Sequence, residues 1–211
     1  NLYTASVVAL DLKTGKLRWH FQTTHHDIFE QDLGTPLVLY NSTVNGKPVR
    51  GVAAMRTDGI LFLLDRATGK PLIPIEERPV KQDARLLTAP TQPFPLGVEP
   101  IGPRCVQPDM VPKGFVLGCY FDPITVGVPN LMAPVMTTRA SPMAYDPQTR
   151  LFYAAAGVTA LWLQRWDDPF VFSSDAATAI PGVKNYGILA AIDSATGKIA
   201  WQKRMPYRIE G

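Results

Sequence analysis

A short phrase that recurs along the chain constrains its fold more than any other feature. It occurs intact at residues 11–19 and 193–201, as Asp-x-x-Thr-Gly-Lys with a tryptophan four positions after the glycine. A related copy occupies residues 65–73, and a degenerate copy occupies residues 146–153. The aspartate can accept hydrogen bonds from the amides of a turn, and the glycine supplies the positive φ that closes it. Because an apolar run precedes each copy, every copy predicts a strand, a turn and a second strand.

The spacing of these copies indicates the architecture. The four aspartates stand at positions 11, 65, 146 and 193, so the steps between them are 54, 81 and 47 residues. Units of roughly 40–50 residues built from short strands are typical of the four-stranded blades of a β-propeller. A β-solenoid is the competing interpretation, but its repeats are shorter and more regular. We therefore predict an all-β propeller in which the long middle step contains an insertion.

The predicted organisation covers residues 1–211 as one partial propeller. Blade repeats are expected near residues 5–24, 36–73, 136–156 and 187–205, with a Pro-rich insertion at 74–135 and an aromatic loop without strands at 159–186. Four blade signatures do not close a ring, because each blade must bury its faces against neighbours. The remaining blades are expected from further sequence or from another chain.

Composition excludes several classes of protein. Hydrophobic residues make up 46% and charged residues 18% of the chain, which fits a globular, strand-rich protein. The net charge of +3 is scattered, so it does not indicate nucleic-acid binding. No apolar run approaches the ~20 residues of a membrane-spanning helix, and the chain does not open with a signal peptide.

The chain has two cysteines, Cys105 and Cys119, and both lie in the Pro-rich insertion. A metal or redox pair is one interpretation, but the spacing is unsuitable and no histidine is near. A structural disulfide is favoured, which closes a modest loop and indicates an oxidising compartment.

Two kinds of residue are candidates for chemistry. Residues 25–32 (HHDIFEQD) bring together two histidines and three carboxylates, which can act as a general base or bind a hard cation, although a solvated charged loop is the alternative. His25 and His26 are adjacent and would face opposite ways on a strand, which argues against a zinc site. Arg56 and Arg139 each precede a predicted strand. Each is either an exposed arginine or a fork that grips a carboxylate or an oxyanion.

These motifs carry a family resemblance that covers most of the chain. The phrase at 9–19, repeated at 191–201, resembles the tryptophan-docking motif of the pyrroloquinoline-quinone (PQQ) dehydrogenases, in the membrane glucose and polyol dehydrogenase branch. Further segments that resemble this branch follow in the same order, at 21–27, 55–59, 64–66, 90–95 and 143–147.

The resemblance implies about four blades of an eight-bladed ring with PQQ and calcium on its axis. In such enzymes a carboxylate removes the proton of an alcohol or sugar hydroxyl while hydride passes to the quinone. By position Glu30 falls on the catalytic aspartate and is the implied calcium ligand, with Asp27 or Asp32 as alternative bases. Arg56 falls on the basic residue that stabilises the quinone oxygen, and Arg139 falls near PQQ. The implied location is the periplasm, with a quinone or a cytochrome as electron acceptor.

One departure from the family pattern supports a second hypothesis. Glu30 is longer by a methylene than the aspartate it replaces, and a base misplaced by ~1 Å can lose ~100-fold in rate. The alternative is a non-catalytic propeller scaffold resembling the outer-membrane assembly lipoproteins. Such scaffolds have shorter blades and need neither the Pro-rich insertion nor the carboxylates of residues 25–32.

Overall fold

The computed structural model is built of β-strands, with one short 3₁₀ segment, η1 (Pro108–Met110), among the residues it describes. Those residues are 2–28, 31–44, 46–128, 130–132, 135–137, 142–165, 172–174 and 182–209. Within them, no helix has the length and apolar character needed to cross a membrane.

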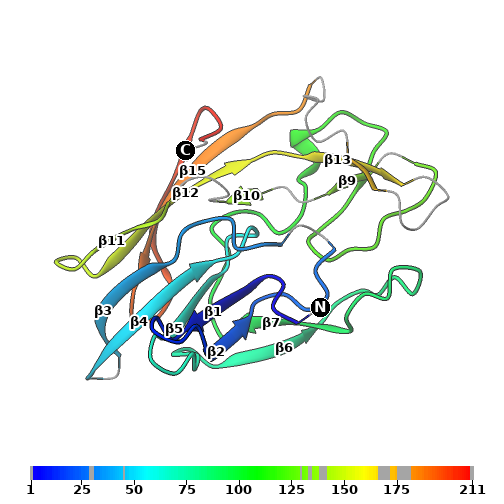
Figure 1. The fold of residues 1–211 in the computed structure, drawn as a ribbon. Helices are drawn as coiled ribbons and strands as arrows, with labels where there is room; N and C mark the ends of the chain where they lie inside the picture. The colour runs from blue at the N-terminus through cyan, green and yellow to red at the C-terminus, as the bar shows by residue number, and fades with distance from the viewer. Residues whose placement is uncertain are drawn as a thin grey trace.

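Three antiparallel sheets contain the repeated phrases (Figure 1). The first pairs β1 (Ser6–Leu10) with β2 (Leu17–Gln22), and the second has the order β3 (Val38–Val44), β4 (Lys47–Met55), β5 (Leu61–Asp65). The third, here the β12–β15 sheet, contains β10 (Val135–Thr137), β11 (Ala144–Asp146), β12 (Leu151–Val158), β15 (Tyr186–Asp193) and β16 (Ile199–Met205).

Two smaller sheets lie outside this set. One is the hairpin of β6 (Ile75–Pro79) and β7 (Thr91–Pro95). The other has the order β14 (Phe172–Ser174), β13 (Leu161–Arg165), β9 (Asn130–Met132), β8 (Val116–Leu117).

The repeated turns have the predicted geometry. Asp11 Oδ1 accepts hydrogen bonds from the amide and hydroxyl of Thr14 at 3.0 and 2.9 Å, and Gly15 has a φ of 68°. The Thr14 hydroxyl and amide hold the pKa of the Asp11 carboxyl below its usual value. The turns at Asp65 and Asp193 repeat these bonds, and the degenerate copy places Arg150 at a φ of 59° where the others have glycine.

Three expectations about the elements were wrong. The copy at 65–73 does not form a full hairpin, because only Leu64 and Pro71 pair and a proline lacks the N–H that extends a ladder. The copies at 146–153 and 193–201 belong to one sheet rather than two blades, since β12 pairs with β15 from Leu151↔Asp193 to Val158↔Tyr186. The segment 159–186, expected to be a loop without strands, contains β13 and β14. Strand β13 pairs with β9 on one side and with β14 on the other.

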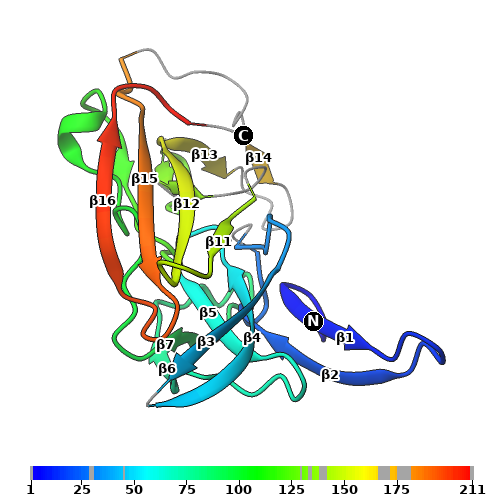
Figure 2. The same cartoon turned by 90° about the vertical axis from the view of Figure 1, so that its left-hand side faces the viewer.

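Large side chains of one sheet rest on the turn glycine of the next. A Cβ on Gly69 would lie 2.5 Å from Trp19 Cε3, so the indole of Trp19 occupies the space that a side chain would fill. Ile73 has the same repeat position as Trp19, and its Cδ1 would lie 2.9 Å from a Cβ on Gly197. The β3–β4–β5 sheet therefore lies between the β1–β2 hairpin and the β12–β15 sheet (Figure 2).

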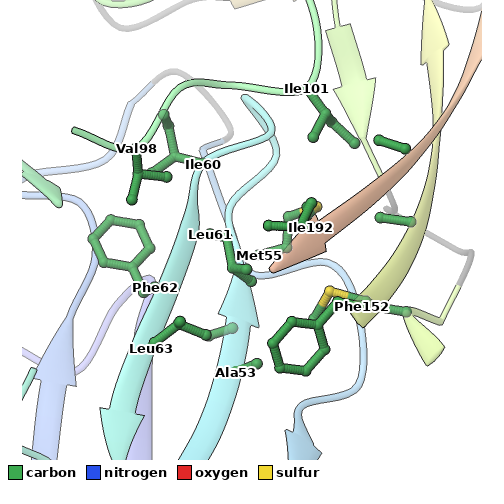
Figure 3. Packing of buried hydrophobic residues seen from close by; sticks show 14 of the residues in the cluster. Ala53, Met55, Ile60, Leu61, Phe62, Leu63, Val98, Ile101, Phe152 and Ile192 are labelled. Atoms are coloured by element: carbon green, nitrogen blue, oxygen red, sulfur yellow. The ribbon is translucent and has the colours of Figure 1, made fainter. Parts of the chain in front are cut away.

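The core lies between the β3–β4–β5 sheet and the β12–β15 sheet. Met55, Leu61, Phe152 and Ile192 are at most 2% exposed and come from both sheets (Figure 3). Val98 and Ile101 of the insertion complete this cluster and are also buried. The Pro-rich insertion thus supplies core residues.

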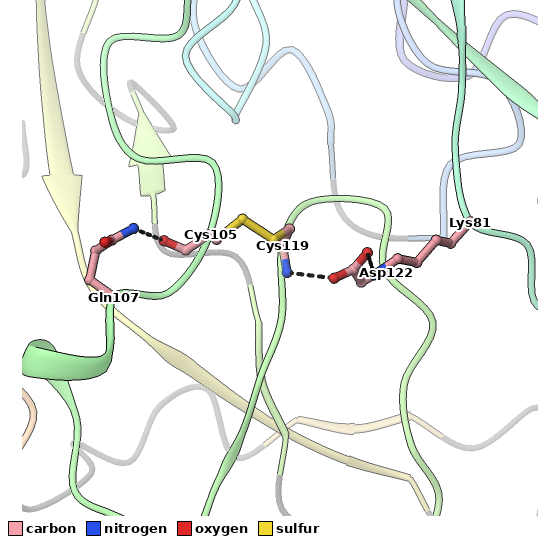
Figure 4. The surroundings of a disulfide bond; sticks show 5 residues. All are labelled: Lys81, Cys105, Gln107, Cys119 and Asp122. Carbon is pink, nitrogen blue, oxygen red and sulfur yellow. Dashed lines mark hydrogen bonds and ion pairs between the residues drawn. A yellow bond between two sulfur atoms is a disulfide. The ribbon is translucent and has the colours of Figure 1, made fainter.

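The predicted disulfide is confirmed. Cys105 and Cys119 are bonded and lie opposite each other as an isolated β-bridge (Figure 4). The Cys119 amide donates to Asp122 Oδ2 at 3.0 Å, and Asp122 Oδ1 forms an ion pair with Lys81 Nζ at 3.0 Å. The disulfide thus joins residues 105 and 119, and the Lys81–Asp122 ion pair connects this segment to the chain that follows β6.

Candidate active site

Residues 25–32 follow β2 and are called the acidic segment below; hydrogen bonds between their two ends close them into a loop. Thr24 Oγ1 donates to the carbonyl of Gln31 at 3.1 Å, and the amide of Gln31 donates to Asp27 Oδ1 at 3.1 Å. Thr24 is fully buried, and His26 has a φ of 43°. The two histidines therefore lie in a turn rather than on a strand. Glu30, which this loop brackets, lies outside the described residues.

A tight turn follows β4 and presents the candidate basic residue. The amide of Arg56 donates to the carbonyl of Ile60 at 3.0 Å, and that of Gly59 donates to the Arg56 carbonyl at 2.8 Å. Gly59 has a φ of 83°, a conformation that favours glycine. Asp58 Oδ1 accepts the amide of Ile60 at 3.2 Å, which secures the turn before β5 begins.

The structure brings these two segments into contact. The Thr57 amide donates to the Asp32 carbonyl at 3.1 Å, and the Thr57 hydroxyl lies 2.9 Å from Asp32 Oδ1. Arg56 Nη1 donates to the carbonyl of Thr23 at 2.6 Å. The Arg56 turn therefore lies against residues 25–32 and the residue pair that precedes them; the catalytic roles implied for these residues stay predictions.

Arg56 is fully buried, so the interpretation as a solvent-exposed arginine was wrong. Its Nε and Nη2 donate to the two carboxylate oxygens of Asp58 at 3.0 and 2.8 Å, and its Nη1 also reaches the carbonyl of Pro93 at 3.2 Å. The guanidinium lies 4.9 to 5.4 Å from the ring centroids of three phenylalanines, Phe62, Phe94 and Phe121. The Arg56 guanidinium therefore binds a carboxylate, which was the second interpretation, but that carboxylate is the side chain of Asp58 and not part of a ligand.

Among the described residues, the side chains at this contact are of the type that binds a hard cation, but there are too few of them for a calcium site. Asp27 and Asp32 offer carboxylate oxygens near the contact, whereas calcium takes about 6–8 oxygen ligands. No group of three His, Cys, Asp or Glu side chains suited to a metal occurs among the described residues. Arg139, the second predicted cofactor contact, lies outside the described residues. A groove between the insertion and β15–β16 is lined by Tyr186 and Trp201 and includes no residue of the acidic segment or the Arg56 turn.

The sequence analysis missed two residues that organise this contact. Thr57 joins the turn to Asp32, and Asp58 neutralises Arg56. The signal for Asp58 was present, because an arginine and an aspartate two positions apart lie in a turn that leads into the apolar run at residues 60–64. The signal for Thr57 was absent, because its partner lies 25 residues away.

Comparisons with known proteins identify the family of the chain. A family model described as "PQQ: Glucose/ethanol/alcohol dehydrogenase, beta-propeller domain" matches residues 1–114. The quinoprotein glucose dehydrogenase of Escherichia coli (strain K12) is 43% identical over 94 residues, which are 44% of this chain and 12% of that protein. The glycerol dehydrogenase large subunit of Gluconobacter thailandicus is 32% identical over 187 residues, which are 78% of this chain and 25% of that protein.

Solved structures show the same fold. The quinohemoprotein alcohol dehydrogenase from Comamonas testosteroni superposes with a TM-score of 0.59 at 23% identity, covering 99% of this chain and 30% of that one. A europium-containing methanol dehydrogenase has a TM-score of 0.59 at 18% identity, covering 98% and 34%. The predicted all-β propeller class is confirmed. The chain spans about a third of these solved structures and a quarter or less of the two curated relatives.

Proposed function

This chain belongs to the PQQ family of glucose/ethanol/alcohol dehydrogenase β-propeller domains, and we propose on that basis that it forms part of a dehydrogenase for an alcohol or sugar hydroxyl. The proposed cofactors are PQQ and calcium. The observation that carries the proposal is the contact between the acidic segment and the Arg56 turn, which unites the two candidate elements of the site.

The proposed role of the acidic segment is proton removal. A carboxylate oxygen of Glu30 accepts the hydroxyl proton of the substrate, and Asp27 is the alternative base. Glu30 is also the proposed calcium ligand. When bound, PQQ supplies a two-electron acceptor for the hydride, and calcium supplies a Lewis acid. The bonds of Thr24 and Asp27 to Gln31 orient the segment by fixing the chain on both sides of position 30.

The proposed role of Arg56 is to order the turn next to this segment. Because its fork is held by Asp58 and by two backbone carbonyls, a direct bond to the cofactor would require the pair to open. We therefore assign Arg56 the task of ordering the turn that binds Asp32. Arg139 remains the proposed residue for direct contact with PQQ.

A kinetic comparison tests this function on the full-length protein. Reconstitution with PQQ and calcium, with an artificial electron acceptor, should give turnover of an alcohol or an aldose. Glu30→Gln should lower kcat by roughly 100-fold or more, as expected for loss of a general base. Asp27→Asn separates the two candidate bases, and Glu99→Gln, at an exposed position of the insertion, is the matched control. Absence of any PQQ-dependent turnover in the wild type would instead favour the non-catalytic scaffold.

The proposed location is the periplasm. The disulfide between Cys105 and Cys119 supports it, because such bonds persist in oxidising compartments. The electron acceptor is proposed to be a quinone or a cytochrome. Thiol labelling of the protein from a periplasmic fraction should find both cysteines blocked until a reductant is added.

A further inference from the structure

Strand β7 contacts both segments of the candidate site through three consecutive residues. The side-chain amide of Gln92 bonds the backbone of His25, the carbonyl of Pro93 accepts a hydrogen bond from Arg56, and the ring of Phe94 lies 4.9 Å from the Arg56 guanidinium carbon. The β6–β7 hairpin of the insertion thus makes direct contacts with residues of the candidate site.

The Gln92 side chain binds both backbone polar groups of one residue. Gln92 Oε1 accepts the His25 amide at 2.8 Å, and Gln92 Nε2 donates to the His25 carbonyl at 2.8 Å. Gln92 is 1% exposed, so this bond pair is shielded from water. A buried amide whose donor and acceptor both bind one backbone residue fixes the position and the direction of the chain there.

The backbone direction at this point governs where the acidic segment goes. The next residue, His26, has a φ of 43°, a conformation that non-glycine residues rarely adopt. Asp27 follows at once and bonds the amide of Gln31, so an error at His25 would be transmitted to the whole loop. The other described tether, His25 Nε2 to Glu77 Oε1 at 3.0 Å, joins side chains that are 37% and 48% exposed, and pairs so exposed contribute little.

We propose that Gln92 is a positioning residue that sets the path of the catalytic acidic segment by clamping the backbone of His25. This inference rests on the proposed function. It assigns part of the Pro-rich insertion to the reaction, through a residue that touches neither substrate nor cofactor. A glutamate at position 92 keeps the shape but cannot donate to the His25 carbonyl, and an alanine leaves both groups of His25 without this partner.

The test compares Gln92→Ala and Gln92→Glu with Gln82→Ala in the full-length protein. Gln82 belongs to the same insertion, and its Nε2 donates to the carbonyl of Thr88, away from the site. Hydrogen–deuterium exchange without PQQ should accelerate by about 10-fold or more in peptides covering residues 23–32 of both position-92 variants. Peptides covering residues 186–193, which form β15 and pair with β12 and β16, should exchange as in the wild type, which shows that the fold is retained. With PQQ and calcium, kcat should fall by about 10-fold or more with little change in KM.

The outcomes separate this inference from the proposed function. If the wild type turns over and the position-92 variants match Gln82→Ala in exchange or in kcat, the positioning role is refuted and the dehydrogenase assignment stands. If the wild type shows no PQQ-dependent turnover, the proposed function fails and the positioning role fails with it, whatever the exchange rates show.

Discussion

The fit of Trp19 onto Gly69 makes a quantitative prediction about Gly69→Ala. The new methyl group would lie 2.5 Å from Trp19 Cε3 and 2.6 Å from Cδ2, well inside van der Waals contact. The indole would therefore have to move. It would then lose the hydrogen bond from its Nε1 to the Arg66 carbonyl, which measures 3.2 Å.

The matched control is Gly46→Ala. Gly46 has a φ of 75° and Gly69 a φ of 72°, so both substitutions place alanine in the left-handed region at a cost of about 1–2 kcal/mol. A Cβ on Gly46 would meet no atom within 4 Å, so only this backbone cost applies there. At Gly69 we add about 1 kcal/mol for the hydrogen bond and about 1–3 kcal/mol for overpacking.

Equilibrium unfolding in urea at 25 °C, fitted with a common m-value, measures the difference. Gly69→Ala should lower the free energy of unfolding by about 2–4 kcal/mol more than Gly46→Ala. Combining Trp19→Ala with Gly69→Ala should recover part of that excess, since the double mutant no longer has a ring to displace. Equal losses for the two glycine substitutions, within about 0.5 kcal/mol, would refute the assignment of Trp19 as the contact between the sheets.

Three other perturbations have expected outcomes. Asp58→Asn should lower the free energy of unfolding by about 3–5 kcal/mol, because it leaves the charge of Arg56 buried without its ion pair. Urea titration measures this loss, and a loss below about 1 kcal/mol would contradict the prediction. Cys105→Ser should cost about 3 kcal/mol, measured as a lower urea midpoint that the wild type matches only after reduction. The Thr68 hydroxyl lowers the pKa of Asp65 below 3.8, so the stabilisation is complete above that pH and is lost as pH falls through the lowered value. Thermal melting from pH 5 to pH 2 should therefore show a smaller loss in Asp65→Asn than in the wild type, and identical slopes would refute this origin.

The sequence was informative where the interactions are local. The turns at Asp11 and Asp193 formed as expected, because the aspartate, threonine and glycine that build each turn lie within five residues. The contact between the acidic segment and the Arg56 turn had no local signal, because Asp32 and Thr57 stand 25 residues apart. The disulfide followed from having two cysteines in one Pro-rich segment.

The remaining features depend on distant partners. The pairing of β12 with β15 joins strands separated by residues 159–185, a segment far longer than a hairpin loop, so no local signal specifies the pairing. The burial of Arg56 depends on Phe94 and Phe121, which belong to the insertion and stand far from it in sequence. Gln92 gave no signal either, since its partner His25 lies 67 residues away.

The packing of a large side chain against a turn glycine bears on which parts of such a chain can differ in length. Both junctions between these sheets include the same pair of places, a glycine in one sheet and the residue four positions after the glycine of the other, as with Trp19 on Gly69 and Ile73 on Gly197. The chain between those places can be long, as the insertion after Ile73 is, provided that core residues such as Val98 keep their packing on Gly197. A scaffold fastened in this way can gain new catalytic or recognition segments between junctions, and the long insertion that carries Gln92 is one such addition.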